Sequence, residues 1–124
     1  MPTHKLQNYL RMYRKQSGLT QRDVAFLLSC RNGGEVSRYE KRKRMPPLRM
    51  ALACEATFGV PVSELFAGMR EAAGKEVGKR VLALKSKLET HPAKGSKARI
   101  AAQKLRWLAE RIGEIIRLLG WMPG

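Results

Sequence analysis

The feature that most constrains the fold is a series of helix caps and helix breakers between residues 19 and 46. Thr20 is a good N-cap, and Asp23 follows three residues later in the pattern of a capping box, which predicts the start of a helix. Gly33-Gly34 predicts a turn, and Met45-Pro46-Pro47 ends the helical pattern that follows it. Two short helices joined by a turn are therefore expected in this stretch.

Four consecutive cations follow the second of these helices: Lys41, Arg42, Lys43 and Arg44. Two short helices joined by a glycine-containing turn are the layout of a helix-turn-helix, in which one helix lies across the DNA backbone and the next enters the major groove. The cations come directly after the groove-entering helix, so they are candidates for contact with DNA phosphates. A solvated loop is the alternative interpretation of the same four residues.

The charge of the whole chain also favours a polyanion as its partner. The 124 residues include 25 Lys and Arg against 10 Asp and Glu, a formal net charge of +15. A field of this size favours nucleic acid first and an anionic membrane surface second. Residues 1–66 hold 12 basic and 5 acidic side chains, and residues 67–124 hold 13 and 5, so the charge is not confined to a tail.

We predict an all-α chain of seven helices: a five-helix bundle over residues 1–67, and an antiparallel two-helix hairpin over residues 68–124. Apolar spacing, caps and breakers place the helices at about 4–16, after the Thr20 cap, 34–41, 47–58, after a cap at Ser63, 69–89 and 97–119. The side chains expected to face inward include Leu6, Leu27, Val36, Tyr39, Leu48, Leu52, Val77 and Leu84.

The last helix carries two apolar stripes. One follows a heptad pattern and is a candidate dimer or partner seam: Leu105, Leu108, Ile112, Ile115 and Leu119. The other consists of Ile100, Trp107, Ile116 and Leu118. One stripe can pack on the sixth helix, and the other then needs a further partner, either the N-terminal bundle or a second subunit. A hairpin that buries its seam is a simpler interpretation than helices resting on a membrane surface.

A series of short motifs occurs between residues 5 and 66: Arg14, Ser17-Gly18-Leu19-Thr20-Gln21, Val24-Ala25, Val36-Ser37-Arg38-Tyr39-Glu40, Lys43-Arg44-Met45-Pro46, Phe58-Gly59-Val60 and Ser63-Glu64-Leu65-Phe66. In this order and at this spacing they resemble the phage-repressor-like (Cro/XRE-type) helix-turn-helix family. The resemblance covers about half of the chain and does not extend to residues 67–124. It implies a regulator of bacterial or phage transcription, a repressor, that binds double-stranded DNA. We expect residues 68–124 to mediate dimerisation, which would make the protein a homodimer, or to bind another protein.

The resemblance also assigns roles to single residues. Gln21, with Arg22 beside it, matches the start of the second helix, where the family contacts a DNA phosphate; an exposed helix-start residue is the alternative. Arg14 and Glu40 match a structural ion pair between the first and third helices. Ser37 and Arg38 match outward positions of the recognition helix, where arginine can bind guanine bidentately or simply attract phosphate.

The chain departs from the family between Leu28 and Val36, where it has seven residues in place of the usual six. Positions that often read bases fall on Gly33 and Gly34, which have no side chain for this purpose. Either base readout depends on Arg31, Asn32, Ser37 and Arg38, or sequence specificity is low. Low specificity would suit an adaptor or architectural protein whose C-terminal hairpin binds another protein.

We find no pattern of catalytic, metal-binding or cofactor-binding residues. His4 and His91 are isolated, and Cys30 and Cys54 lie in apolar runs, as expected for buried thiols in a reducing cytoplasm. We see no signal peptide and no apolar run long enough to span a membrane. We therefore expect a cytoplasmic protein that is not an enzyme and needs no metal or cofactor.

Overall fold

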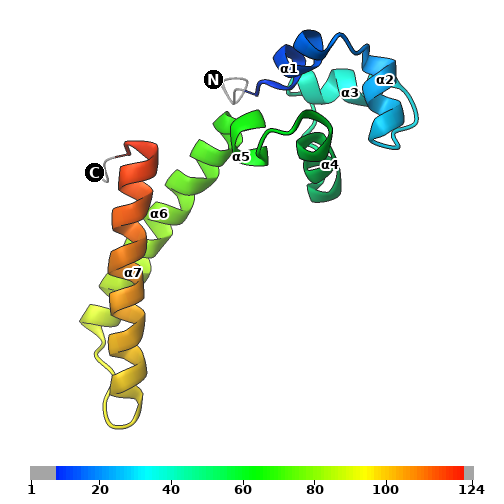
Figure 1. Cartoon of the computed structure of the whole chain (residues 1–124). Coiled ribbons are helices and arrows are strands. Elements are labelled where there is room, and N and C mark those ends of the chain that lie inside the picture. Colours follow the sequence, from blue (N-terminus) through cyan, green and yellow to red (C-terminus); the bar gives the residue numbers. More distant parts are fainter. Residues whose placement is uncertain (1–7, 122–124) are drawn as a thin grey trace. The chain divides into compact units, whose positions relative to one another are not determined.

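The computed structural model describes residues 8–121, and every regular element in that range is a helix, as predicted (Figure 1). The helices are α1 (Leu10–Ser17), α2 (Gln21–Leu27), α3 (Gly33–Glu40), α4 (Leu48–Phe58), α5 (Val62–Leu65), α6 (Ala67–Thr90) and α7 (Lys97–Leu119). Contacts divide the chain into two compact units, Met1–Arg70 and Glu71–Gly124, with the division inside α6. Within residues 8–121, no helix combines the length and apolar character that crossing a bilayer requires.

The first unit is built around a small core to which each of α1 to α5 contributes. Its most deeply buried side chains are Leu10, Val24, Val36, Tyr39, Cys54 and Leu65. Helices this short are not stable alone, so packing of their apolar sides supplies most of their stability. The predicted inward positions Val36 and Tyr39 are confirmed, and they fix which side of α3 faces out.

The N-terminal cap of α2 has the predicted pattern. The Thr20 hydroxyl accepts a hydrogen bond from the Asp23 backbone N–H at 3.0 Å, and the Asp23 carboxylate accepts one from the Thr20 N–H at 3.0 Å. The Thr20 backbone N–H, and after it the Thr20 hydroxyl, lower the pKa of Asp23 below its usual value, because hydrogen bonding to the carboxylate stabilises its charged form. The capping box therefore fixes the start of α2 at Gln21.

The first helix begins later than predicted. Residues 4–7, including Leu6, lie outside the described residues, and α1 begins at Leu10. The Tyr9 N–H donates to the Leu65 carbonyl at 2.7 Å, while the Asn8 side-chain oxygen Oδ1 accepts from the Leu10 N–H at 3.3 Å. These bonds tie the chain before Leu10 to α5 and to itself, in place of an earlier helical turn.

Three apolar residues expected in the first core are exposed instead: Leu27, Leu48 and Leu52. Leu27 and Leu52 lie beside buried positions, and Leu48 lies one turn before the buried Ala51. A short helix in a small bundle buries a narrower side than apolar spacing suggests. The start of the fifth helix also differs from the prediction. Pro61 is the N-cap of α5, and Ser63 lies within the helix.

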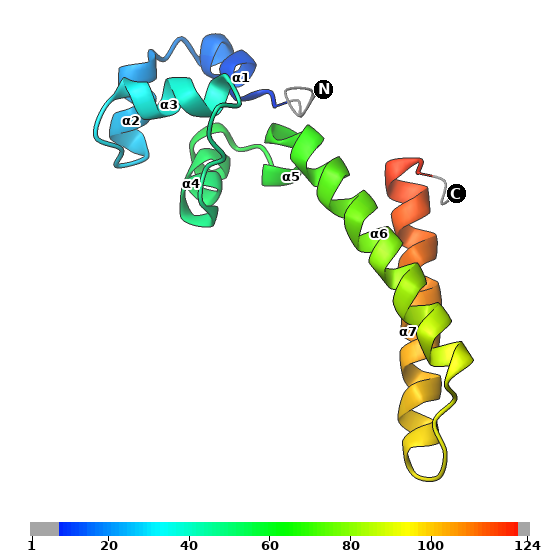
Figure 2. The same cartoon turned by 180° about the vertical axis from the view of Figure 1, so that it is seen from behind.

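In the second unit, α7 runs back alongside the part of α6 after Arg70, as a hairpin (Figures 1 and 2). Val81 and Leu108 are buried between the helices. At the open end, Leu119 lies against Gly74 and Trp121 lies against Gly78. The heptad residues Leu105, Leu108, Ile112, Ile115 and Leu119 are all at least half-buried, and we call them the seam.

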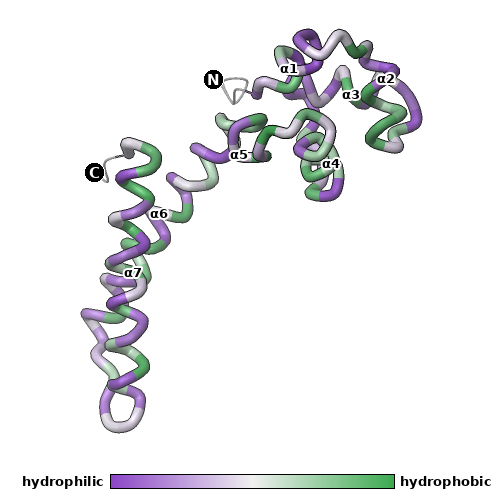
Figure 3. The backbone as a smooth tube through the Cα atoms, viewed as in Figure 1, coloured by the Kyte–Doolittle hydropathy of each residue, from purple (hydrophilic) through white to green (hydrophobic). Residues whose placement is uncertain are grey.

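The side of α6 that faces α7 was predicted only in part. Val77 and Leu84 were expected inward, but they are 50% and 46% exposed, while Gly78 is buried. Hydrophobic and hydrophilic residues alternate along both helices, so several orientations satisfy the apolar pattern (Figure 3). The two glycines decide between them, because only a residue without a side chain lets α7 approach so closely.

Candidate nucleic-acid interface

The third helix has a well-defined outward side. Val36 and Tyr39 anchor it to the core, Arg38 is exposed, and Ser37 is partly exposed. Asn32 is its N-cap, and the Asn32 side-chain oxygen accepts a hydrogen bond from the Gly34 N–H at 2.8 Å. The helix is therefore fixed at its start as well as by its buried side.

The glycine pair at the start of α3 has a packing role that sequence interpretation missed. A Cβ at Gly33 would lie 3.3 Å from the Arg22 backbone nitrogen and 3.3 Å from the Gln21 Cβ. A Cβ at Gly34 would lie 2.8 Å from the capping oxygen of Asn32. Gly33 thus lets the start of α3 pack against the start of α2, and Gly34 leaves room for the Asn32 cap, at the cost of two side chains that could contact a base.

A buried ion pair joins α1 to the end of α3. Arg14 Nε lies 2.5 Å from Glu40 Oε2, and Arg14 Nη2 donates to Glu40 Oε1 at 3.2 Å. The Arg14 side chain is 10% exposed and that of Glu40 is 3% exposed, so water screens the pair little. A third bond, from Arg14 Nη1 to the Leu19 carbonyl at 3.1 Å, ties the pair to the start of α2.

Gln21 is held by the same ion pair. Its side-chain nitrogen donates to Glu40 Oε1 at 3.1 Å, and its side chain is partly buried. An amide nitrogen carries two N–H groups, so one remains for an external acceptor such as a phosphate oxygen. Arg22 is exposed beside it, so this end of α2 offers one fixed donor and one mobile cation.

The four cations after α3 are part of a helix cap. Arg42 adopts a left-handed backbone conformation with φ of 62°. The Lys43 N–H donates to the Arg38 carbonyl at 2.9 Å, and the Arg42 N–H donates to the Tyr39 carbonyl at 3.1 Å. This is the hydrogen-bond pattern of a Schellman motif. The backbone of this cationic turn, residues 41–44, is therefore tied to α3 while all four side chains stay exposed.

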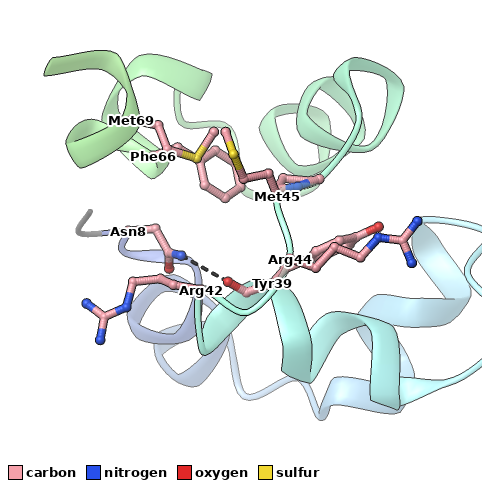
Figure 4. Close-up of a pocket in the computed structure, with 8 residues that line it drawn as sticks. Asn8, Tyr39, Arg42, Arg44, Met45, Phe66 and Met69 are labelled. Carbon is pink, nitrogen blue, oxygen red and sulfur yellow. Dashed lines mark hydrogen bonds between the residues drawn. The ribbon is translucent and has the colours of Figure 1, made fainter. Parts of the chain in front are cut away.

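A cavity of about 270 Å³ lies behind the cationic turn (Figure 4). Met45, Phe66 and Met69 gather on one side of it, and Asn8 closes it by donating to the Tyr39 carbonyl at 3.0 Å. The side chains of Arg42 and Arg44 leave the turn in opposite directions. The turn therefore presents its cations on two sides.

The turn before α3 places Arg31 and Asn32 in solvent. The Arg31 backbone N–H donates to the Glu35 carboxylate at 3.3 Å, so Glu35 faces back toward the turn. The Asn32 oxygen is occupied by the cap, which leaves its amide N–H groups for a base or a phosphate. Packing at Gly33 sets these residues next to Gln21 and Arg22.

The two thiols are poorly suited to reactive chemistry. Burial raises the pKa of the Cys54 thiol to about 12, and the nearby Cys30 adds to the shift. Burial also raises the pKa of Cys30. Both cysteines are therefore neutral thiols near pH 7, and Cys54 fills the core between the helices.

The comparisons with known proteins concern the first unit. Residues 10–65 match a family model described as Helix-turn-helix. No curated protein and no solved structure was found to match the chain. The matched segment spans α1 to α5, with the buried core, the paired Arg14 and Glu40, and the outward side of α3 described above. Residues 10–65 of this chain therefore form a DNA-binding helix-turn-helix domain of the Cro/XRE-type family of transcription regulators.

Proposed function

We propose that this protein represses transcription by binding a specific duplex DNA site with α3 in the major groove. Base edges would be contacted by Arg31, Asn32, Ser37 and Arg38, and phosphates by Gln21, Arg22 and the cationic turn. The observation that carries the proposal is the outward side of α3, which the buried ion pair holds at one end and the Asn32 cap at the other. A rigid helix loses little entropy when it enters a groove, which favours specific contacts.

The proposal includes two copies of the protein on each site. An eight-residue helix can present only a few base-reading side chains, so one copy discriminates weakly among the competing sites of a genome. Two copies on a near-palindromic site, with their α3 helices about 34 Å apart, would add their contributions. A site that overlaps a promoter would then be closed to polymerase.

Selection of bound duplexes from a random pool, followed by titrations at two salt concentrations, tests this function. The native protein should enrich one near-palindromic sequence and bind it with two copies. Arg38→Ala should reduce the preference at one base pair of each half-site by about 1–3 kcal/mol. Lys15→Ala, which removes an exposed cation from α1, serves as the control and should leave the preference unchanged.

A second candidate function is an adaptor or architectural role with non-specific DNA binding. The observation that favours it is the glycine pair, which leaves the first turn of α3 without base-reading side chains. The same titrations separate the two functions. Equal, steeply salt-dependent binding of selected and random duplexes would support the adaptor and contradict the repressor.

A further inference from the structure

The hairpin exposes several large apolar side chains. Five of them are between 46% and 59% exposed, and we call them the apolar face: Val77, Leu84, Ile100, Trp107 and Leu118. Single exposed apolar residues are ordinary, but five on one pair of helices suggest an interaction surface. The seam does not explain them, because its residues are used between α6 and α7.

The face residues of α7 lie on one side of that helix. Each comes directly before a residue that packs toward α6. Each therefore lies at the same rotation about the α7 axis from the packed residue that follows it. The pairs are Ile100 with Ala101, Trp107 with Leu108, and Leu118 with Leu119.

The face residues of α6 have the same relation to their own helix. Val77 comes directly before the buried Gly78, and Leu84 directly before the half-buried Lys85. In an antiparallel pair of helices, a residue that directly precedes a packed position lies on the same side of the pair, whichever helix carries it. The contact of Gly74 with Leu119 sets the register, which places Val77 within one helical turn of Leu118 along the hairpin. The five side chains therefore form one surface across both helices.

The charge around this surface is positive. Residues 71–124 contain 12 Lys and Arg and 5 Glu, a formal charge of +7. Four of the glutamates already pair within their own helix, with Lys75, Arg80, Lys85 and Arg117. Lys79, Lys87 and Lys104 make no ion pair with any residue that the structure describes. The uncompensated charge of the hairpin is therefore almost entirely cationic.

Trp107 provides an anchor within the face. It is 59% exposed, and the Arg111 guanidinium lies 5.7 Å from the centre of its ring. Lys104 lies one helical turn before it. A tryptophan flanked by cations offers apolar area together with charge at its edge, the combination that dominates many protein interfaces.

We propose that the apolar face binds an acidic amphipathic helix from another protein. The apolar side of such a helix would cover Val77, Leu84, Trp107 and their neighbours, and its carboxylates would meet the cations around them. A second copy of this hairpin would bring another positive surface into the contact, which costs free energy at every cation pair. The proposal does not depend on the DNA-binding proposal, since none of its residues belongs to the first unit.

Two synthetic peptides of about 21 residues test it with the full chain. Both carry leucine at the a and d heptad positions; one has glutamate and the other lysine at the remaining positions. Binding is followed by the anisotropy of a dye on the peptide. The acidic peptide should bind about tenfold more tightly than the basic one, and Trp107→Ala should weaken it about tenfold.

Two matched charge reversals on α7 give the control. The double variant Lys104→Glu with Arg111→Glu reverses the charges beside Trp107. It should bind the basic peptide more tightly than the acidic one. Arg99→Glu with Arg106→Glu makes the same charge change on another side of α7 and should keep the preference. Helix content by circular dichroism shows that each variant is folded.

Three results would overturn the proposal. The first is equal binding of the two peptides, or acidic-peptide binding that Trp107→Ala leaves unchanged. The second is a self-associated protein in sedimentation equilibrium that Trp107→Ala converts to a monomer, since the face would then belong to a second copy. The third is a protein that binds neither peptide and whose affinity for DNA falls when Lys104 and Arg111 are both changed to glutamate. The surface would then bind nucleic acid.

Discussion

Arg42 combines two requirements that conflict at a single residue. Its left-handed backbone, with φ of 62°, favours glycine, while its position in the cationic turn favours a charged side chain. A left-handed conformation costs a non-glycine residue about 1–2 kcal/mol. The strain is the cost of placing a cation directly after α3.

Replacement of Arg42 by glycine should therefore separate stability from DNA affinity. We expect Arg42→Gly to raise the free energy of unfolding by about 1 kcal/mol, because the left-handed strain is relieved. If Arg42 contacts a phosphate, the salt dependence of DNA binding should fall by about 0.9 in slope. Urea denaturation and salt titration measure the two effects.

Arg42→Ala is the matched control for this change. It removes the same charge but keeps a side chain in the left-handed conformation, so the salt slope should fall as in Arg42→Gly without the gain in stability. Equal stability of the two variants would contradict the assignment of strain to this residue.

The Arg14–Glu40 pair predicts a large single-residue effect. Glu40→Ala would leave the Arg14 guanidinium buried without its counter-ion, and Gln21 without its acceptor. We expect a loss of about 3–5 kcal/mol in the free energy of unfolding. Chemical denaturation of the purified variant measures it.

The double variant Arg14→Met with Glu40→Leu tests whether the loss comes from the uncompensated charge. Two apolar side chains of similar size leave no buried charge, so the double variant should be more stable than Glu40→Ala alone. A double variant as unstable as the single one would show that the pair acts through something other than charge compensation.

At the scale of elements, the pairing of α6 with α7 depends on Gly74 and Gly78. Helical spacing predicted both helices closely, because caps and apolar periodicity are local properties of the sequence. The facing side of α6 is not local, since it depends on what α7 presents. The contacts of Gly74 with Leu119 and of Gly78 with Trp121 could not be predicted from helical spacing.

Gly78→Ala should destabilise the hairpin, although alanine favours a helix by about 1 kcal/mol over glycine. The new Cβ would lie 2.9 Å from Cη2 of the rigid Trp121 ring, so the ring would have to move away from α6. Gly113→Ala is the matched control: it adds a methyl group within α7 with nothing closer than 4 Å, and it should stabilise the hairpin. Thermal unfolding followed by circular dichroism compares them. A Gly78→Ala protein as stable as Gly113→Ala would contradict the contact.

At the scale of the whole molecule, the division into two compact units predicts separate responses to mutation. Glu40→Ala should speed amide hydrogen exchange within residues 10–66 and leave α7 unchanged, because the buried ion pair lies wholly in the first unit. Gly78→Ala should speed exchange in α7 and leave residues 10–66 unchanged. Exchange followed by mass spectrometry on the full chain measures both, and spread of either effect across the chain would show that the units fold as one.

The sequence by itself determined the all-α class, the seven helices to within a few residues apart from the start of the first, and the helix-turn-helix family of residues 10–65. Caps, breakers and apolar spacing act between residues that are close in the chain, so the sequence contains them directly. Tertiary structure alone decided that Gln21 bonds to Glu40, that Gly33 packs on α2, and that Val77 and Leu84 face outward. These features depend on which surface a distant segment presents, and local periodicity carries no information about that partner.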